Sequence, residues 1–175
     1  MKIASWCIAG ALLAAANAHA VDGFAVEAGN GDATDMARIG IQWNWKKRWF
    51  QGASWHLGGY WDLQLGYWRG HSAAGGNNTI TDLGLTPVFR LQQNDLKGLY
   101  AEAAIGFHLL SKTAINADRK FGSSFQFGDH VGAGYRFGTK GEFDVSYRYQ
   151  HLSNGGIQQP NQGISFNQIR FQYHF

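Results

Sequence analysis

The chain has 175 residues, of which 15% are charged and 15% are aromatic, and it contains 24 glycines. The charged fraction is well below the roughly 25% of an ordinary soluble domain, and the aromatic content argues against a disordered chain. The net charge of +3 comes from scattered basic residues without a run of Lys or Arg. The composition therefore gives no support to a nucleic-acid partner, and the length suits one domain.

The first twenty residues have the pattern of a secretory signal peptide. Lys2 gives the positive start, residues 8–16 form an apolar run, and residues 18–20 read Ala-His-Ala, a small-x-small cleavage site. We predict cleavage after Ala20. Removing 20 of the 175 residues leaves a mature domain of 155 residues, 21–175. Losing Lys2 leaves 14 basic against 12 acidic residues, a net charge of +2. The one cysteine, Cys7, leaves with the leader, which excludes disulfides, cysteine-zinc sites and a cysteine nucleophile.

The rest of the chain alternates between apolar and polar residues, which is the pattern of β-strands. No segment approaches the 18 or so consecutive apolar residues of a membrane helix. In all predicted strands but the first, large apolar side chains occupy the odd positions, and the charges occupy the even ones: Arg38, Asp62, Asp82, Arg90, Glu102, Arg136, Asp144, Arg148 and Arg170. The predicted strands are 24–28, 37–45, 55–67, 81–91, 99–109, 125–137, 143–153 and 165–175.

Alternation alone does not say which face of the sheet is the inside. Three features decide it here: nearly every strand carries the aromatic-rich apolar face, the opposite face mixes charges with glycines, and the chain ends in alternating apolar residues that close on Phe175. That ending resembles the assembly signal of bacterial outer-membrane barrels. We therefore predict an all-β protein, an eight-stranded antiparallel transmembrane β-barrel with lipid outside and a polar interior. Eight strands enclose too little space for a transport pore.

A few polar residues interrupt the lipid-facing side of this predicted barrel: Thr81, Asp129, His151, Ser153, Ser165 and Asn167. Polar groups placed against lipid are costly and usually mark function. Counting from the turn near residue 140 places residue 129 (Asp129) opposite His151, and residue 127 opposite Ser153. Centring the next loop near residue 159 places Asn167 beside His151 and Ser165 beside Ser153. Five of the six residues then form one patch, which strand counting from a periplasmic N-terminus puts at the extracellular end.

His151 and Ser153 point from the same face of one strand, about 7 Å apart along the backbone. A histidine that takes the serine proton creates a nucleophile for acyl transfer. A bare His-x-Ser pair is common by chance, however, and the alternative is that both residues sit at the membrane interface and reach lipid headgroups.

The segments around this pair resemble the lipid A 3-O-deacylase (PagL) family. The resemblance lies in residues 151–157 (HLSNGGI), 159–163 (QPNQG) and 122–130 (GSSFQFGDH). It implies an outer-membrane serine esterase that acts on lipopolysaccharide and removes the hydroxyacyl chain ester-linked at position 3 of lipid A. The site would lie on the outside of the barrel, toward the outer leaflet, and would need no cofactor and no metal.

The same resemblance assigns roles to individual residues. His151 would be the general base and Ser153 the nucleophile. The backbone of Asn154 and the side chain of Asn161 would form the oxyanion site, and Phe127 would contact the acyl chain.

One position departs from the family pattern, because the family carries an acid fourteen residues after the histidine and this chain has Ser165 there. Losing the acid from a catalytic triad can cost several orders of magnitude in rate. Asp129 could supply the charge, Asn167 could orient the ring without charge, or Ser165 could hold the ring weakly. A slow or inactive family member is the remaining alternative.

Two other functions compete with this interpretation. A non-enzymatic barrel for adhesion or membrane integrity would leave the polar patch unexplained, and an acyltransferase that holds a chain inside would need an apolar lumen.

Lys112, Arg119 and Lys120 could meet substrate phosphates or simply be solvated. The oligomeric state is open, with a homodimer as one alternative.

Overall fold

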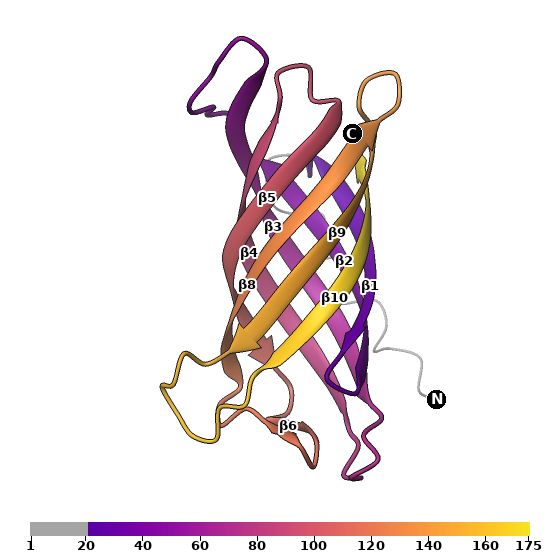
Figure 1. The fold of residues 1–175 in the computed structure, drawn as a ribbon, viewed down its shortest axis with the longest axis vertical. Coiled ribbons are helices and arrows are strands. Elements are labelled where there is room, and N and C mark those ends of the chain that lie inside the picture. The colour runs from indigo at the N-terminus through magenta and orange to yellow at the C-terminus, as the bar shows by residue number, and fades with distance from the viewer. Residues whose placement is uncertain (1–20) are drawn as a thin grey trace, which may run out of the picture.

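The computed structural model describes residues 21–175, and the predicted leader lies outside the described residues. Eight strands form a closed antiparallel barrel in the order β1-β10-β9-β8-β5-β4-β3-β2 (Figure 1). They are β1 (Gly23–Gly31), β2 (Thr34–Asn44), β3 (Trp55–Gly70), β4 (Thr79–Gln93), β5 (Gly98–Leu110), β8 (Phe125–Phe137), β9 (Phe143–Ser153) and β10 (Ile164–His174). The predicted eight-stranded barrel is confirmed.

The structure extends this prediction in two places. Several strands run longer than predicted; β1, for example, continues to Gly31 rather than ending at residue 28. The segment between β5 and β8 also contains a small hairpin, β6 (Ala114–Asn116) and β7 (Arg119–Lys120), at the lower end of the barrel in Figure 1. Strands of two or three residues are too short to give a periodic sequence pattern. Among residues 21–175 no helix is long and apolar enough to cross a membrane.

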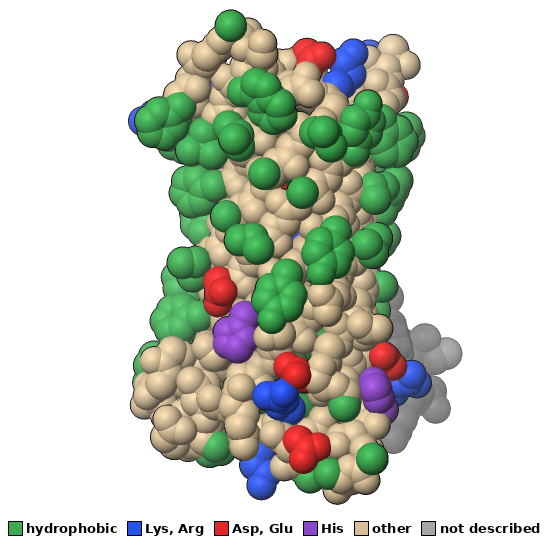
Figure 2. All heavy atoms as spheres, viewed as in Figure 1, with side chains coloured by type: hydrophobic (Ala, Val, Ile, Leu, Met, Phe, Trp, Pro, Cys, Tyr) green, Lys and Arg blue, Asp and Glu red, His purple; other side chains and the backbone are tan. Residues whose placement is uncertain are grey.

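The apolar face is on the outside of the barrel. Ile39 and Ile105 are 60% and 64% exposed, and Figure 2 shows apolar side chains over the middle of the wall with charges toward the two ends. In β1 the even residues Phe24 and Val26 face outward instead. The reason is the two-residue turn after Gly31, which pairs residue 31 with residue 34 and so reverses the odd-even phase between β1 and β2.

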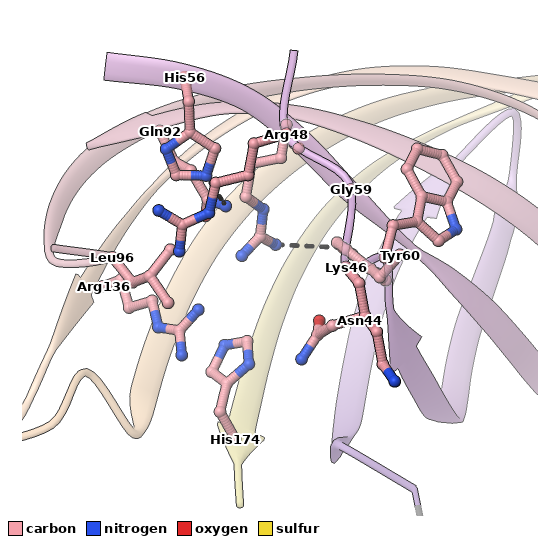
Figure 3. A pocket seen from close by; sticks show the side chains of 13 residues that line it. Asn44, Lys46, Arg48, His56, Gly59, Tyr60, Gln92, Leu96, Arg136 and His174 are labelled. Atoms are coloured by element: carbon pink, nitrogen blue, oxygen red, sulfur yellow. Dashed lines mark hydrogen bonds between the residues drawn. The ribbon is translucent and has the colours of Figure 1, made fainter. Parts of the chain in front are cut away.

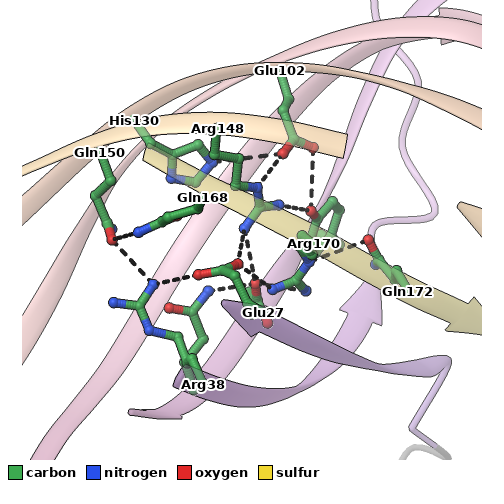
Figure 4. Close-up of polar contacts among 12 residues, drawn as sticks. Glu27, Arg38, Glu102, His130, Arg148, Gln150, Gln168, Arg170 and Gln172 are labelled. Atoms are coloured by element: carbon green, nitrogen blue, oxygen red, sulfur yellow. Dashed lines mark hydrogen bonds and ion pairs between the residues drawn. The ribbon is translucent and has the colours of Figure 1, made fainter. Parts of the chain in front are cut away.

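The central lumen is filled by a buried network of ion pairs (Figure 4). Glu27 accepts hydrogen bonds from Arg38 at 2.8 Å and from both Arg148 and Arg170 at 3.3 Å. Arg148 also donates to Glu102 at 2.6 Å. Buried charges persist only when they are paired and hydrogen-bonded, so the network both satisfies the charged face and closes the barrel to transport.

One end of the lumen is apolar, which corrects the prediction of a polar interior. The packed residues there are buried and all apolar: Met36, Trp68, Ile80, Leu110, Ile115, Phe121, Leu152, Ile164 and Phe166. The members of this group that lie on the barrel strands are all at even positions, the inward face of β2 to β10. The sequence therefore contains apolar residues on the inward face, but the charges on the same face led to the prediction of a polar interior. We call this group the apolar plug. It anchors the ends of β9 and β10, between which the candidate site lies.

Candidate active site

Three neighbouring strands bring the predicted residues together on the lipid-facing wall. The register pairs Asp129 of β8 with His151 of β9, and His151 with Ser165 of β10. Ser153 is paired with Phe127. The predicted pairs 129–151 and 127–153 are therefore confirmed, and His151, Ser153 and Ser165 are each half-buried.

The predicted register between β9 and β10 is wrong by two residues. Ser165, not Asn167, lies opposite His151, and Asn167 lies opposite Tyr149. Both registers keep the same side chains outside, so alternation could not separate them. In the observed register Leu152 pairs with Ile164, and both side chains pack in the apolar plug.

The His151 ring is hydrogen-bonded through one nitrogen and has a glycine beside the other. Its Nδ1 lies 2.9 Å from Ser165 Oγ. Gly163 lies beside Cε1 and Nε2, where an added Cβ would come within 2.8 Å of Cε1 and 3.0 Å of Nε2. Ser153 Oγ makes no hydrogen bond within residues 21–175, so it is free to turn toward Nε2. With Nδ1 occupied by Ser165, Nε2 is the ring nitrogen left without a hydrogen-bond partner in residues 21–175.

Neither of the other two candidates for orienting the ring hydrogen-bonds to it within residues 21–175. Asp129 faces the same side as His151 but is exposed and makes no hydrogen bond to the ring in the described part of the chain. Asn167 accepts a hydrogen bond from the Tyr147 hydroxyl. Ser165 is therefore the residue of the three that holds the imidazole.

The loop from residue 154 to 163 is organised by Asn154, whose side chain is buried. Its amide donates to the carbonyl oxygens of Phe121 at 2.8 Å and Gln158 at 2.7 Å. Its backbone N–H donates to Asn161 Oδ1 at 3.0 Å. The two predicted oxyanion groups, the Asn154 backbone N–H and the Asn161 side chain, thus lie next to each other beside Ser153. In this structure they are hydrogen-bonded to one another.

Phe127 lies beside Ser153 within an aromatic cluster. Its ring centroid is 5.0 Å from that of Phe125 and 6.1 Å from that of Phe107. An open groove of about 560 Å³ runs along the wall from Asp129 over β4, β5 and β8. It is lined mostly by apolar side chains: Pro87, Phe89, Ala103, Ile105, Val131 and Tyr149. The surroundings of Ser153 are therefore suited to acyl chains.

Comparisons with known proteins relate this chain to one enzyme family. The family model described as lipid A 3-O-deacylase (PagL) matches residues 35–174. The chain belongs to the PagL family. A lipid A deacylase PagL from Pseudomonas aeruginosa is 37% identical over 150 residues, which cover 85% of this chain and 83% of the relative. Another from Bordetella bronchiseptica is 39% identical over 89 residues, covering 51% of this chain and 47% of the relative.

A solved structure supports the same conclusion. The crystal structure of the outer membrane enzyme PagL matches with a TM-score of 0.76 and 29% identity, covering 87% of this chain and 99% of that one. Together with the family match, this makes the chain an outer-membrane β-barrel hydrolase of the PagL family, as the sequence predicted.

The residue at the PagL acid position is linked to a residue that the sequence did not single out. The backbone N–H of Ser165 donates to Asp32 Oδ2 at 2.8 Å. Asp32 Oδ1 in turn accepts from Arg119 at 2.5 Å. Asp32 lies in the β1–β2 turn, far from the PagL motifs in the sequence, so only the closure of the barrel reveals this contact.

A polar cavity of about 220 Å³ lies at the other end of the barrel (Figure 3). His56 and His174 line it, but their ring nitrogens already have partners: His56 meets Asn94 and Gln92, and His174 meets Gln42 and Asp144. The part of the chain that the structure describes contains no group of three His, Cys, Asp or Glu residues suited to a metal. None of the PagL motif residues lines this cavity.

Proposed function

We propose that this chain hydrolyses the ester that holds the hydroxyacyl chain at position 3 of lipid A, with Ser153 as nucleophile and His151 as general base. The observation that carries the proposal is the pairing of His151 with Ser165 on the lipid-facing wall, which leaves Nε2 for Ser153. The proposed reaction is that of the PagL family, and the proposed mechanism is based on the positions of His151 and Ser153.

The reaction follows the double displacement of serine esterases. His151 Nε2 takes the proton of Ser153 Oγ as that oxygen attacks the ester carbonyl carbon. The tetrahedral intermediate collapses, the sugar oxygen leaves with the proton from His151, and the acyl chain stays on Ser153. A water molecule, deprotonated by His151, then attacks the acyl-enzyme. The free hydroxy fatty acid leaves, and Ser153 Oγ regains its proton.

The oxyanion would be bound beside Ser153 by Asn154 and Asn161. The Asn154 N–H follows the nucleophile directly, as in many esterases, but it is engaged by Asn161 Oδ1. In this proposal the substrate oxygen replaces Asn161 Oδ1 on that N–H, and the Asn161 amide turns to donate its own N–H. Once turned toward the substrate oxygen, these two donors would stabilise the negative charge that develops on it in the transition state.

Substrate would reach the site from the membrane. Because the lumen is filled by ion pairs and by the apolar plug, access is along the outer wall, where lipid A in the outer leaflet can slide its ester past Ser153. The apolar groove and Phe127 would receive acyl chains. No cofactor enters the steps, and all the residues named above come from one chain.

The direct test is the mass of lipid A from cells or vesicles that contain wild type, Ser153→Ala or His151→Asn. Wild type is expected to remove one hydroxyacyl mass from position 3. Ser153→Ala should lower the rate by about 10⁴ or more, as for other serine hydrolases. Thr81→Ala, which removes a lipid-facing hydroxyl outside the site, is the matched control and should keep full activity. Deacylation by either site variant at the wild-type rate would refute the mechanism.

A further inference from the structure

We propose that Asp32 is a positioning residue for His151 that acts through Ser165 and replaces part of the role of the missing PagL acid. The inference rests on the proposed function, since it concerns the same histidine. Its basis is the continuous chain of contacts from Arg119 through Asp32 and Ser165 to His151, which joins β7, the β1–β2 turn, β10 and β9.

The β1–β2 turn is shaped to bring Asp32 to this position. Asp32 and Ala33 have φ values of 49° and 53°, as the tight two-residue hairpin turn requires. Gly31 precedes them, and a Cβ there would overlap the carbonyl oxygen of Ser165. The missing side chain at residue 31 therefore lets the turn approach the start of β10 closely enough for the carboxylate to reach the Ser165 N–H.

Ser165 alone performs only half of what a triad acid does. Its hydroxyl can accept the Nδ1–H of His151 and fix the ring, but it carries no charge to stabilise the imidazolium that forms during acyl transfer. The Asp32 carboxylate, one residue further along the contact chain, holds the backbone of Ser165 in place and adds a negative charge next to the residue that contacts Nδ1. A charge-assisted bond to a backbone N–H is stronger than a neutral one.

Arg119 fixes Asp32 and also limits its effect. The guanidinium lies 2.5 Å from Asp32 Oδ1 and donates at 3.4 Å to the carbonyl oxygen of Gln162, in the loop next to the site. The Asp32 side chain is 26% exposed, so water and Arg119 both screen its charge. The expected contribution is therefore moderate, smaller than that of an acid in direct contact with the histidine.

Steady-state kinetics of detergent-solubilised, folded protein on lipid A tests the proposal. Asp32→Asn should lower kcat about tenfold with KM within about twofold, because the change affects the transition state rather than substrate binding. Asp35→Asn is the matched control: Asp35 lies in the same hairpin, pairs with Arg69 on the surface and does not contact Ser165. It should leave both constants unchanged. Wild-type kcat in Asp32→Asn would overturn the proposal.

The pH profile separates an effect on His151 from a loss of folding. Removing a nearby negative charge disfavours the protonated imidazole, so the acid limb of the kcat profile should move to lower pH in Asp32→Asn. The other ionisable groups on the wall beside the ring are Asp129 of β8 and Tyr149 of β9, and both stay in place. A uniform loss of activity with an unmoved limb would contradict the positioning role.

A second background makes the test independent of stability. Ser165→Glu places a carboxylate at the PagL acid position, against Nδ1 of His151, and should raise kcat. If Asp32 acts through this position, Asp32→Asn in the Ser165→Glu background should change kcat less than about twofold, a clear departure from additivity. An equal tenfold loss in both backgrounds would show that Asp32 does not compensate for the missing acid, and would overturn the proposal.

Labelling of Ser153 by a fluorophosphonate probe distinguishes a failure here from a failure of the proposed function. The probe reports activation of the serine by histidine whatever the natural ester is. Slower labelling in Asp32→Asn than in Asp35→Asn would support the role of Asp32 even if lipid A is not deacylated. Equal labelling of the two variants would overturn it even if lipid A is deacylated. A wild-type protein that neither labels nor deacylates would refute both proposals.

Discussion

His151 has one ring nitrogen in a hydrogen bond and the other unbonded within residues 21–175. Ser165 occupies Nδ1, and Gly163 leaves no room for a side chain beside Cε1 and Nε2. One hydrogen bond therefore orients the ring, and any side chain at residue 163 would make a steric contact with it.

Gly163→Ala tests the steric contact. A Cβ at residue 163 would lie 2.8 Å from Cε1 of His151, and the backbone there has a φ of +63°, so the ring or the loop must shift. A misplacement of about 1 Å can cost 10²-fold in rate, and we expect a loss of that order in kcat. Gly156→Ala is the control, because its added Cβ meets nothing within 4 Å although its φ of +82° carries the same backbone penalty. Equal losses in the two variants would show that backbone strain, not the ring contact, is responsible.

Asn161→Asp tests the oxyanion assignment. The carboxylate can still accept the hydrogen bond of the Asn154 N–H, so the loop should keep its shape, but it has no N–H to donate to the oxyanion. We expect kcat to fall about 10²-fold or more, as for loss of one oxyanion donor elsewhere, with KM little changed. Full activity in Asn161→Asp, measured by release of the hydroxy fatty acid, would exclude Asn161 as a donor.

At the scale of the strands, the site depends on the register of β9 with β10. Alternation fixed which residues face the lipid, and the tight turn between β8 and β9 gave the pairs of Asp129 and Phe127 correctly. The ten-residue loop after Ser153 has no such constraint. Its register is set by the packing of Leu152 and Ile164 inside the barrel, which a sequence pattern of period two cannot show.

Leu152→Ala tests whether packing in the apolar plug stabilises the ends of β9 and β10 in this register. Leu152 lies between His151 and Ser153 and is completely buried, so truncation should cost about 2–5 kcal/mol of the free energy of unfolding. It should also reduce activity by loosening both neighbours. Leu99→Ala, on the lipid-facing wall at 64% exposure, creates no internal cavity and should cost less. Equal losses, measured by urea unfolding in detergent, would contradict this role of the plug.

The catalytic pair and the oxyanion residues could be proposed from sequence because they lie within one short motif. Asp32 could not, since it is 133 residues from Ser165 along the chain. It reaches the site only because β1 pairs with β10 when the barrel closes. Contacts of this kind depend on closure and on a glycine next to the turn, and neither leaves a local pattern in the residues around the motif.

For the molecule as a whole, the direction of the apolar face determines everything else. The buried ion pairs around Glu27 fill the lumen, which leaves the outer wall as the surface on which a lipid can be bound. Ser153 lies on that wall, where it faces the membrane. Residues 21–175 contain no cysteine, so a single spin label can be placed at will.

The most direct test is the collision rate of a nitroxide at residue 153, in protein reconstituted into vesicles, with oxygen and with a water-soluble nickel chelate. Val131→Cys on the lipid-facing wall and Thr86→Cys in the filled lumen give the two references. A label on Ser153→Cys should collide readily with oxygen, as at Val131, with some added access to the chelate because the site lies near the end of the barrel. Low collision rates with both reagents, as at Thr86, would place the serine inside and contradict the account.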